Sequence, residues 1–235
     1  MSNFLRKRSN EIELMDDLQS SGPVIDQTLK ELAVINQLLG GNYVTLLGLD
    51  SFTNQDEPLH IIDIGCGGGD MMMQICDWAT KQGIDIRITG VDANPNIIEY
   101  ARRNTENYPQ IDYLACDIFS EEFKALTCDV VTATLFTHHF SDNELIRLFS
   151  QLKGQARKGM VINDLHRHWF AYHSIKLLTR VFSKSKMVRN DAAVSVKRAF
   201  HKNELATILY KSGIHGFDLS WHWAFRWKVV ATWDH

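Results

Sequence analysis

The sequence contains few of the features that would place it outside the ordinary globular proteins. Only four of its 235 residues are cysteine and four are proline. No apolar run approaches the ~20 residues that a membrane-spanning helix needs. The cysteines form no C-x-x-C pair and follow no zinc-ligand spacing, so we expect reduced core thiols and no metal site. A fixed-period repeat and a low-complexity tract are absent as well.

An excess of positive charge is also missing. The net charge is −3 and the isoelectric point is near 6.4, whereas a nucleic-acid-binding domain is usually basic. The first 17 residues turn acidic where a signal peptide would need an apolar core. We therefore expect a cytoplasmic protein with no nucleic-acid partner. The chain length and an apolar content of 45% fit an α/β protein with a sizeable core.

The chain changes character near residue 50. Residues 1–50 show helical spacing of apolar residues and are expected to form a helical cap, while residues 51–235 are expected to form the main domain. There, short apolar segments alternate with helical segments of about ten to fifteen residues, which predicts parallel βαβ units. Two late segments, 217–225 and 226–235, are close enough to pair as an antiparallel hairpin. The pattern predicts an α/β fold with a doubly wound, seven-stranded, mostly parallel sheet.

Four glycines follow the first predicted strand in the stretch IIDIGCGGGD, residues 61–70. A dinucleotide fingerprint G-x-G-x-x-G beginning at Gly65 would need a third glycine at the position of Asp70. A carboxylate there would oppose a pyrophosphate at the start of the helix. The stretch fits better an acid followed by glycines at every second position: Asp63, Gly65, Gly67 and Gly69. The glycines allow the backbone to approach a ligand closely.

Acidic residues also follow the next two predicted strands. The order of Asp63, Asp92 and Asp117 with the glycine turn resembles class I S-adenosylmethionine-dependent methyltransferases. The resemblance implies a Rossmann-like sheet and S-adenosylmethionine as cofactor, with Asp92 on the two ribose hydroxyls and Asp117 near the adenine amino group. It implies this set of cofactor-binding residues: Asp63, Gly65, Cys66, Gly67, Gly69, Asp92, Ala93, Asp117, Ile118 and Leu135.

Longer stretches narrow the resemblance. ELMDD, INQLLGG, NDLHRHWFAY and SVKRAF are similar to stretches of bacterial small-molecule methyltransferases that are often encoded beside polyketide synthases, and more distantly of quinone-biosynthesis methyltransferases. The resemblance implies methylation of a phenolic or enolic oxygen of an aromatic or polyketide-like secondary metabolite. Two alternatives stay open: C-methylation of a quinone-like ring, and a partner protein that binds the cofactor without catalysis.

Histidines follow the fourth and fifth predicted strands. A phenol has a pKa near 10, so its methylation at neutral pH benefits from a general base, and histidine suits that task. The candidate bases are His139 after the fourth strand and His166 and His168 after the fifth, with Asp164 placed to orient His166. A metal held by these histidines is disfavoured, since no second carboxylate lies nearby in the sequence.

The connection after the fifth predicted strand is unusually long. Residues 166–200 span it, where about two to six residues commonly suffice, and residues 169–182 have helical spacing. We expect this insertion to be a lid that walls the substrate with an apolar face and a basic rim. A transient contact of its helix with a membrane surface stays open as an alternative.

Overall fold

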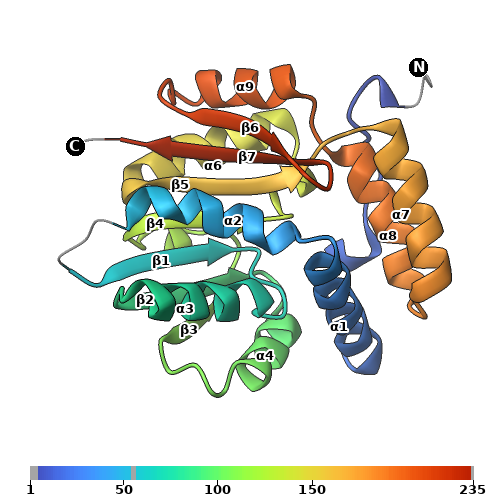
Figure 1. Ribbon diagram of the computed structural model, residues 1–235, viewed down its shortest axis with the longest axis horizontal. Helices are drawn as coiled ribbons and strands as arrows, with labels where there is room; N and C mark the ends of the chain where they lie inside the picture. The colour runs from blue at the N-terminus through green and yellow to red at the C-terminus, as the bar shows by residue number, and fades with distance from the viewer. Residues whose placement is uncertain (1–4, 54–56, 234–235) are drawn as a thin grey trace.

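The computed structural model describes residues 5–53 and 57–233, and one mixed sheet organises them (Figure 1). The seven strands have the order β3-β2-β1-β4-β5-β7-β6. They are β1 (Leu59–Ile64), β2 (Ile86–Asp92), β3 (Ile111–Ala115), β4 (Cys128–Thr134), β5 (Ala156–Leu165), β6 (Asp218–His222) and β7 (Arg226–Thr232). Strands β1 to β5 are parallel, while β7 runs antiparallel to both β5 and β6. The predicted sheet and its edge hairpin are confirmed; residues 234–235, expected in the last strand, lie outside the described residues.

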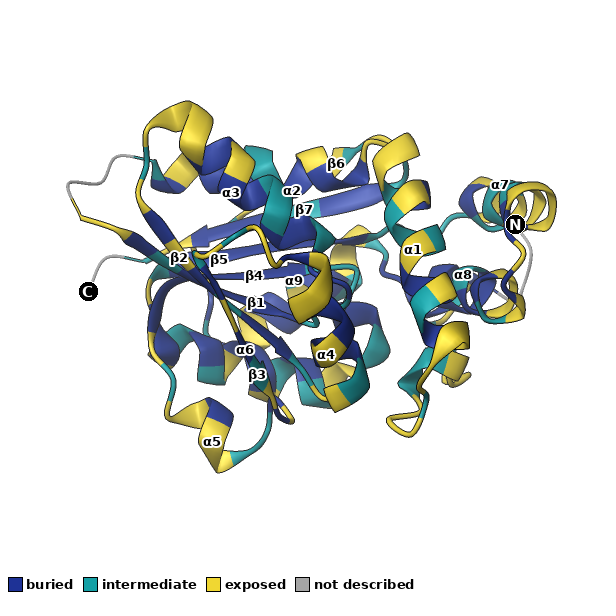
Figure 2. Cartoon of the chain, turned by 90° about the horizontal axis from the view of Figure 1, so that it is seen from below, coloured by how far each residue is buried: buried dark blue, intermediate teal, exposed yellow. Residues whose placement is uncertain are grey.

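Helices cover both faces of this sheet (Figure 2). The helices are α1 (Pro23–Leu38), α2 (Gly41–Leu49), α3 (Asp70–Gln82), α4 (Pro95–Asn104), α5 (Glu121–Lys124), α6 (Asp142–Gln155), α7 (Trp169–Phe182), α8 (Lys186–Arg198) and α9 (Lys202–Lys211), with short 3-10 helices η2 (Leu14–Asp16), η3 (Asp50–Phe52) and η4 (Thr137–His139). Apolar residues of α2, α3 and α4 pack on one face, and those of α5, α6 and α9 pack on the other. The buried strands between these layers form the core.

The strand order reverses between β1 and β4, because β2 and β3 lie on one side of β1 and β4 and β5 on the other. In an open parallel sheet, ligands bind at such a switch point, outside the carboxyl ends of the strands. In Figure 1 the arrowheads of β1 and β5 point toward the end of the molecule where α1, α7 and α8 gather. The fold therefore places a binding site between the strand ends and these three helices.

The connection between β5 and α9 contains two helices, α7 and α8, where the sequence predicted one. The second helix, α8, was missed because its buried side is partly polar: Asp191, Ser195 and Arg198 are all buried there. These side chains bind the N-terminal segment rather than an apolar core. Hydrophobic periodicity alone could not reveal such a helix.

The first 50 residues divide between two places in the structure. Helix α2 packs on the sheet against β4, β5 and β7, and Gly48 there lies so close to Val161 that an added Cβ would be 2.4 Å from it. Helix α1 instead contacts α2 and α8. Within the described residues no single helix has the length and apolar composition to cross a membrane; the pair Pro23–Leu38 and Gly41–Phe52, bent by 71°, meets the criterion only when taken together.

Candidate functional site

A cavity of about 960 Å³ lies at the carboxyl ends of the parallel strands. Its wall has three parts. The glycine turn and the ends of β2 and β3 form the first part. The second consists of η4, the N-terminal segment and α8, and the third consists of α1, α7 and the turn between β6 and β7. The volume is at the upper end of the roughly 300–1,000 Å³ that single small-molecule sites occupy, so there is room for a cofactor and an acceptor.

The glycine turn after β1 has a backbone that other residues would strain. Gly65, Gly67 and Gly69 have φ angles of 66°, 51° and 83°. A Cβ on Gly65 would lie 2.1 Å from the ring of Phe136. The amides of Gly65 and Cys66 donate to the carbonyl of Val91, at 2.8 and 3.1 Å, and so tie the turn to β2. The turn thereby presents bare backbone to the cavity.

Two carboxyl groups, the buried Asp63 and the half-buried Asp92, flank this turn. Asp63 is 2% exposed, and burial raises its pKa to about 7 against the opposing hydrogen bond from the Thr132 hydroxyl at 2.6 Å. Burial likewise raises the pKa of Asp92, although its carboxylate accepts hydrogen bonds from the Asn94 and Gly67 amides at 3.0 and 3.4 Å. Acceptor groups of this kind suit hydroxyl donors and a cationic ligand better than an anionic one.

The structure brings nine of the ten predicted cofactor-binding residues to the cavity wall: Asp63, Gly65, Cys66, Gly67, Asp92, Ala93, Asp117, Ile118 and Leu135. The tenth, Gly69, is not among the lining residues. It begins α3, and a Cβ there would lie 2.7 Å from both Thr105 and Tyr113, so Gly69 is needed for packing. Gly68, Asp70, Met71 and Asn94, which the sequence analysis did not select, line the same part of the wall.

Two adjacent histidines form the second part of the wall. Nδ1 of His138 lies 2.7 Å from Asp164, and Nδ1 of His139 lies 2.6 Å from Asp16. The centroids of the two imidazole rings are 4.4 Å apart, with 32° between their planes. Because each ring is held through Nδ1 by a carboxylate, its Nε2 is the atom left for a further partner.

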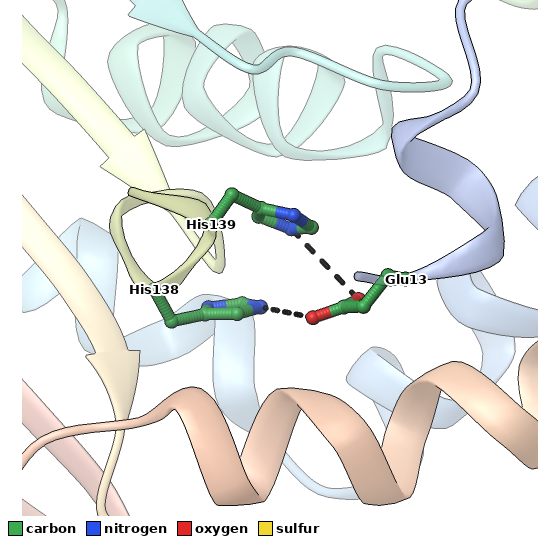
Figure 3. A group of neighbouring side chains, drawn as sticks. All are labelled: Glu13, His138 and His139. Atoms are coloured by element: carbon green, nitrogen blue, oxygen red, sulfur yellow. Dashed lines mark ion pairs between the residues drawn. The ribbon is translucent and has the colours of Figure 1, made fainter. Parts of the chain in front are cut away.

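That further partner is Glu13, which faces both rings (Figure 3). Its Oε1 lies 3.5 Å from Nε2 of His138, and its Oε2 lies 4.0 Å from Nε2 of His139. Ser195 donates to Oε2 at 2.9 Å. The three side chains meet the loose spacing of a metal site. With His138 protonated, the contact between its Nε2 and Glu13 is an ion pair, which accounts for their approach without a metal ion.

The charge of His138 follows from these neighbours. Burial alone would lower the pKa of His138, which is 3% exposed, but Asp164 and Glu13 outweigh it and raise the pKa to about 9. The same imidazolium holds the pKa of Asp164 well below its usual range, in spite of burial. His138 is therefore a buried cation at neutral pH.

The N-terminal segment that supplies Glu13 and Asp16 is fastened to the rest of the protein. Asp16 also accepts from Arg198 of α8 at 2.7 Å, and the amides of Leu14 and Met15 donate to Asp191 at 2.8 and 3.0 Å. Sequence analysis missed both acids as site residues, because an irregular segment has no periodicity. The only signal was the family-like stretch ELMDD, which contains Glu13 and Asp16.

His166 and His168, two of the predicted bases, do not line the cavity. Nδ1 of His166 accepts from Trp221 at 3.2 Å, and burial together with His168 lowers the pKa of His166 to about 4. His168 caps α7 through the Phe170 amide at 3.2 Å. Asp164 was expected to orient His166 but binds His138 instead. Strand β4 lies beside β5, so η4, which follows β4, lies next to Asp164 near the end of β5.

The strand order, the glycine turn and the acid after β2 define the fold of class I S-adenosylmethionine-dependent methyltransferases. Solved structures of the same fold include the plantazolicin methyltransferase BpumL with S-adenosylhomocysteine (TM-score 0.61, 17% identity, 88% of this chain and 86% of that one). Another is human N-acetylserotonin methyltransferase with S-adenosylmethionine (TM-score 0.64, 15% identity, 90% and 56%). These identities support the fold alone.

Residues 61–159 match the model of a methyltransferase domain family, so the chain carries a methyltransferase domain and the resemblance seen in the sequence is confirmed. A malonyl-[acyl-carrier protein] O-methyltransferase of Halalkalibacterium halodurans is 31% identical over 86 residues, 34% of this chain and 29% of that protein. The non-reducing polyketide synthase Preu3 of Preussia isomera is 30% identical over 106 residues, 45% of this chain and 4% of that protein. The chain thus matches less than a third of the length of either relative.

Proposed function

We propose that the protein transfers the methyl group of S-adenosylmethionine to a phenolic or enolic oxygen of a small aromatic or polyketide-like molecule. One observation carries this proposal: a single cavity joins the acid-flanked glycine turn to a pair of carboxylate-bound histidines. A cofactor site and a group that can handle the acceptor proton are the two requirements of such a transfer.

The first part of the wall fits the cofactor. The backbone of Gly65 and Gly67 allows close approach, and the Asp92 carboxylate supplies the two acceptors that a ribose cis-diol needs. Ile118, which is 5% exposed, offers a flat apolar neighbour for adenine. The bound cofactor supplies an electrophilic methyl group on a sulfonium, and the protein mainly aligns the acceptor and excludes water.

The two histidines have different roles toward the acceptor. His138, already protonated at neutral pH, stabilises negative charge on the acceptor oxygen. His139, held by Asp16, is the imidazole that takes the proton from the acceptor hydroxyl. An acceptor oxygen that reaches the two Nε2 atoms takes the place that Glu13 holds in this structure.

Methylation at carbon is the second candidate function. An oxyanion beside His138 also makes the neighbouring ring carbon nucleophilic, so the same residues would serve. Analysis of the methylated product distinguishes an O–CH₃ from a C–CH₃ group, and a purely cofactor-binding protein would yield neither.

The insertion from α7 to α8 is proposed to wall the acceptor. Phe170, Ile175 and Leu178 of α7 line the cavity. On the outer side of the same helix, Leu177 and Val181 are exposed beside lysine and arginine residues. That outer side suits a transient contact with an anionic membrane surface.

Replacing Asp92 by alanine is expected to weaken S-adenosylmethionine binding by about 1 to 3 kcal/mol, or about 5- to 150-fold, because the ribose hydroxyls lose their acceptors. Titration calorimetry measures the change. Asp112→Ala is the matched control, since Asp112 is an exposed acid on β3 that pairs with Arg87 and does not line the cavity. Equal affinities of the wild type and Asp92→Ala would remove Asp92 from the site.

A further inference from the structure

Arg226, the first residue of β7, is a buried cation in the third part of the cavity wall. It is 2% exposed and lines the cavity. It pairs in register with Leu165, whose neighbour Asp164 holds His138. The guanidinium of Arg226 and the histidine pair line the same cavity, and the Asp164 carboxylate that holds His138 also acts electrostatically on Arg226.

The guanidinium of Arg226 has few partners. Nη2 donates to Asn36 at 3.2 Å, while Nε and Nη1 have no hydrogen-bond partner among the described residues. None of the carboxylates in the described part of the chain lies within 4.0 Å of it. Arg167, 1% exposed, is the contrast: it donates to the Leu5 carbonyl at 3.0 Å, to Glu204 at 2.6 Å and to the carbonyl of Ala199.

The fold keeps room for this cation. The guanidinium lies against Gly41, where an added Cβ would be 2.2 Å from Nη2. Burial lowers the pKa of Arg226 to about 10, with the Asp164 carboxylate opposing the shift, so the side chain is charged at neutral pH. A buried charge with unpaired N–H groups is costly. The free-energy cost of burying Arg226 is not offset by partners within the protein. A ligand that supplies the missing hydrogen-bond acceptors explains why an arginine is buried there.

We propose that Arg226 binds a carboxylate of the acceptor, which makes the substrate a hydroxy acid: a phenol or enol that also carries a carboxylate group. This inference rests on the proposed methyl transfer and specifies its substrate class. The planar guanidinium matches a carboxylate with two parallel hydrogen bonds, and it does so better than any other side chain. Arg226 then holds one end of the acceptor while the histidines act on its hydroxyl.

The test compares two acceptors with the same ring, orsellinate and orcinol, which differ by the carboxylate. The wild-type protein is expected to show a kcat/KM about 10- to 100-fold higher for orsellinate, the range for hydrogen bonds to a charged group. In Arg226→Met this ratio is expected to fall to about one. Arg180→Met, which removes an exposed arginine of α7 outside the cavity wall, is expected to keep the wild-type ratio.

Thermal unfolding separates binding from a structural role. Because Arg226→Met removes a charge that the protein leaves largely unpaired, its Tm is expected to equal or exceed that of the wild type. A wild-type kcat/KM ratio of orsellinate to orcinol near one would overturn the proposal. So would a lower Tm of Arg226→Met together with equal losses of kcat/KM for both acceptors. If neither these two acceptors nor any other phenol of a wider panel is methylated, the proposed function fails instead. Calorimetric binding of orsellinate, expected for the wild type and lost in Arg226→Met, then still decides the role of Arg226.

Discussion

His139→Gln is expected to lower kcat by about 10²- to 10⁴-fold, the usual contribution of a positioned general base. Glutamine preserves the size of the side chain and its capacity for hydrogen bonding but cannot take the proton of a phenol. Affinity for S-adenosylmethionine is expected to stay within a factor of a few, because His139 lies in η4 and all the proposed cofactor residues except Leu135 follow or end strands other than β4. Single-turnover kinetics together with calorimetry measure the two quantities separately.

The pH dependence of kcat identifies the base. The loss of kcat in His139→Gln is expected to come with a changed pH–rate profile, because the substitution removes the proton acceptor. His166→Gln is the matched control, because His166 follows the neighbouring strand but does not line the cavity. A large loss in His166→Gln with a normal rate in His139→Gln would reverse the assignment. Normal rates in both would mean that alignment and desolvation suffice without a protein base.

Asp164→Asn is expected to destabilise the protein by about 3 to 5 kcal/mol, because it breaks a fully buried ion pair. Asp164 is 0% exposed and also accepts from the Thr137 hydroxyl at 2.5 Å. Urea unfolding measures the loss. In the double variant with His138→Gln the loss is expected to be smaller than the sum of the two single losses, because the second substitution removes the unpaired cation.

The same ion pair sets a pH dependence of stability. The carboxylates of Asp164 and Glu13 raise the folded-state pKa of His138 from its ordinary value of 6.5 to about 9. The contribution of protonated His138 to the unfolding free energy is therefore fully present below pH ~6.5 and is lost as the pH rises through ~9. We expect the wild-type unfolding free energy to decline over this window and Asp164→Asn to show a flatter curve. Identical pH curves for the two proteins would show that His138 is neutral in the folded state.

Periodicity and local motifs were sufficient to predict the sheet. Apolar segments at 59–64 and 86–92 mark two strands, the first buried along almost its whole length and the second buried mainly on one face. The glycine turn after the first of them needs backbone angles that only glycine adopts readily. The acid after the second strand lines the cavity because parallel strands end at one edge. These features depend on residues close together in the chain, so the sequence alone predicts them.

The acceptor side depends on contacts between residues far apart in the chain. Asp164 binds His138, which is 26 positions away in the chain, and not His166, which is two positions away. The reason is that β4 lies beside β5, so η4 after β4 lies next to Asp164. Glu13 reaches the same histidines from an irregular segment. In the sequence Arg226 looks like any other polar residue of a strand. Only its burial and its lack of hydrogen-bond partners in the structure distinguish it from the exposed arginines. No local pattern encodes such pairings.

The most direct test of the account is to incubate the protein with S-adenosylmethionine that carries a labelled methyl group, in the presence of orsellinate, orcinol and a panel of other phenols. We predict labelled product together with an equal amount of S-adenosylhomocysteine, and loss of both at limiting cofactor in Asp92→Ala. Mass spectrometry of the product locates the methyl group on oxygen or on carbon. Absence of labelled product and of S-adenosylhomocysteine with every acceptor, while calorimetry shows the cofactor bound, would contradict a catalytic role and leave a protein that only binds the cofactor.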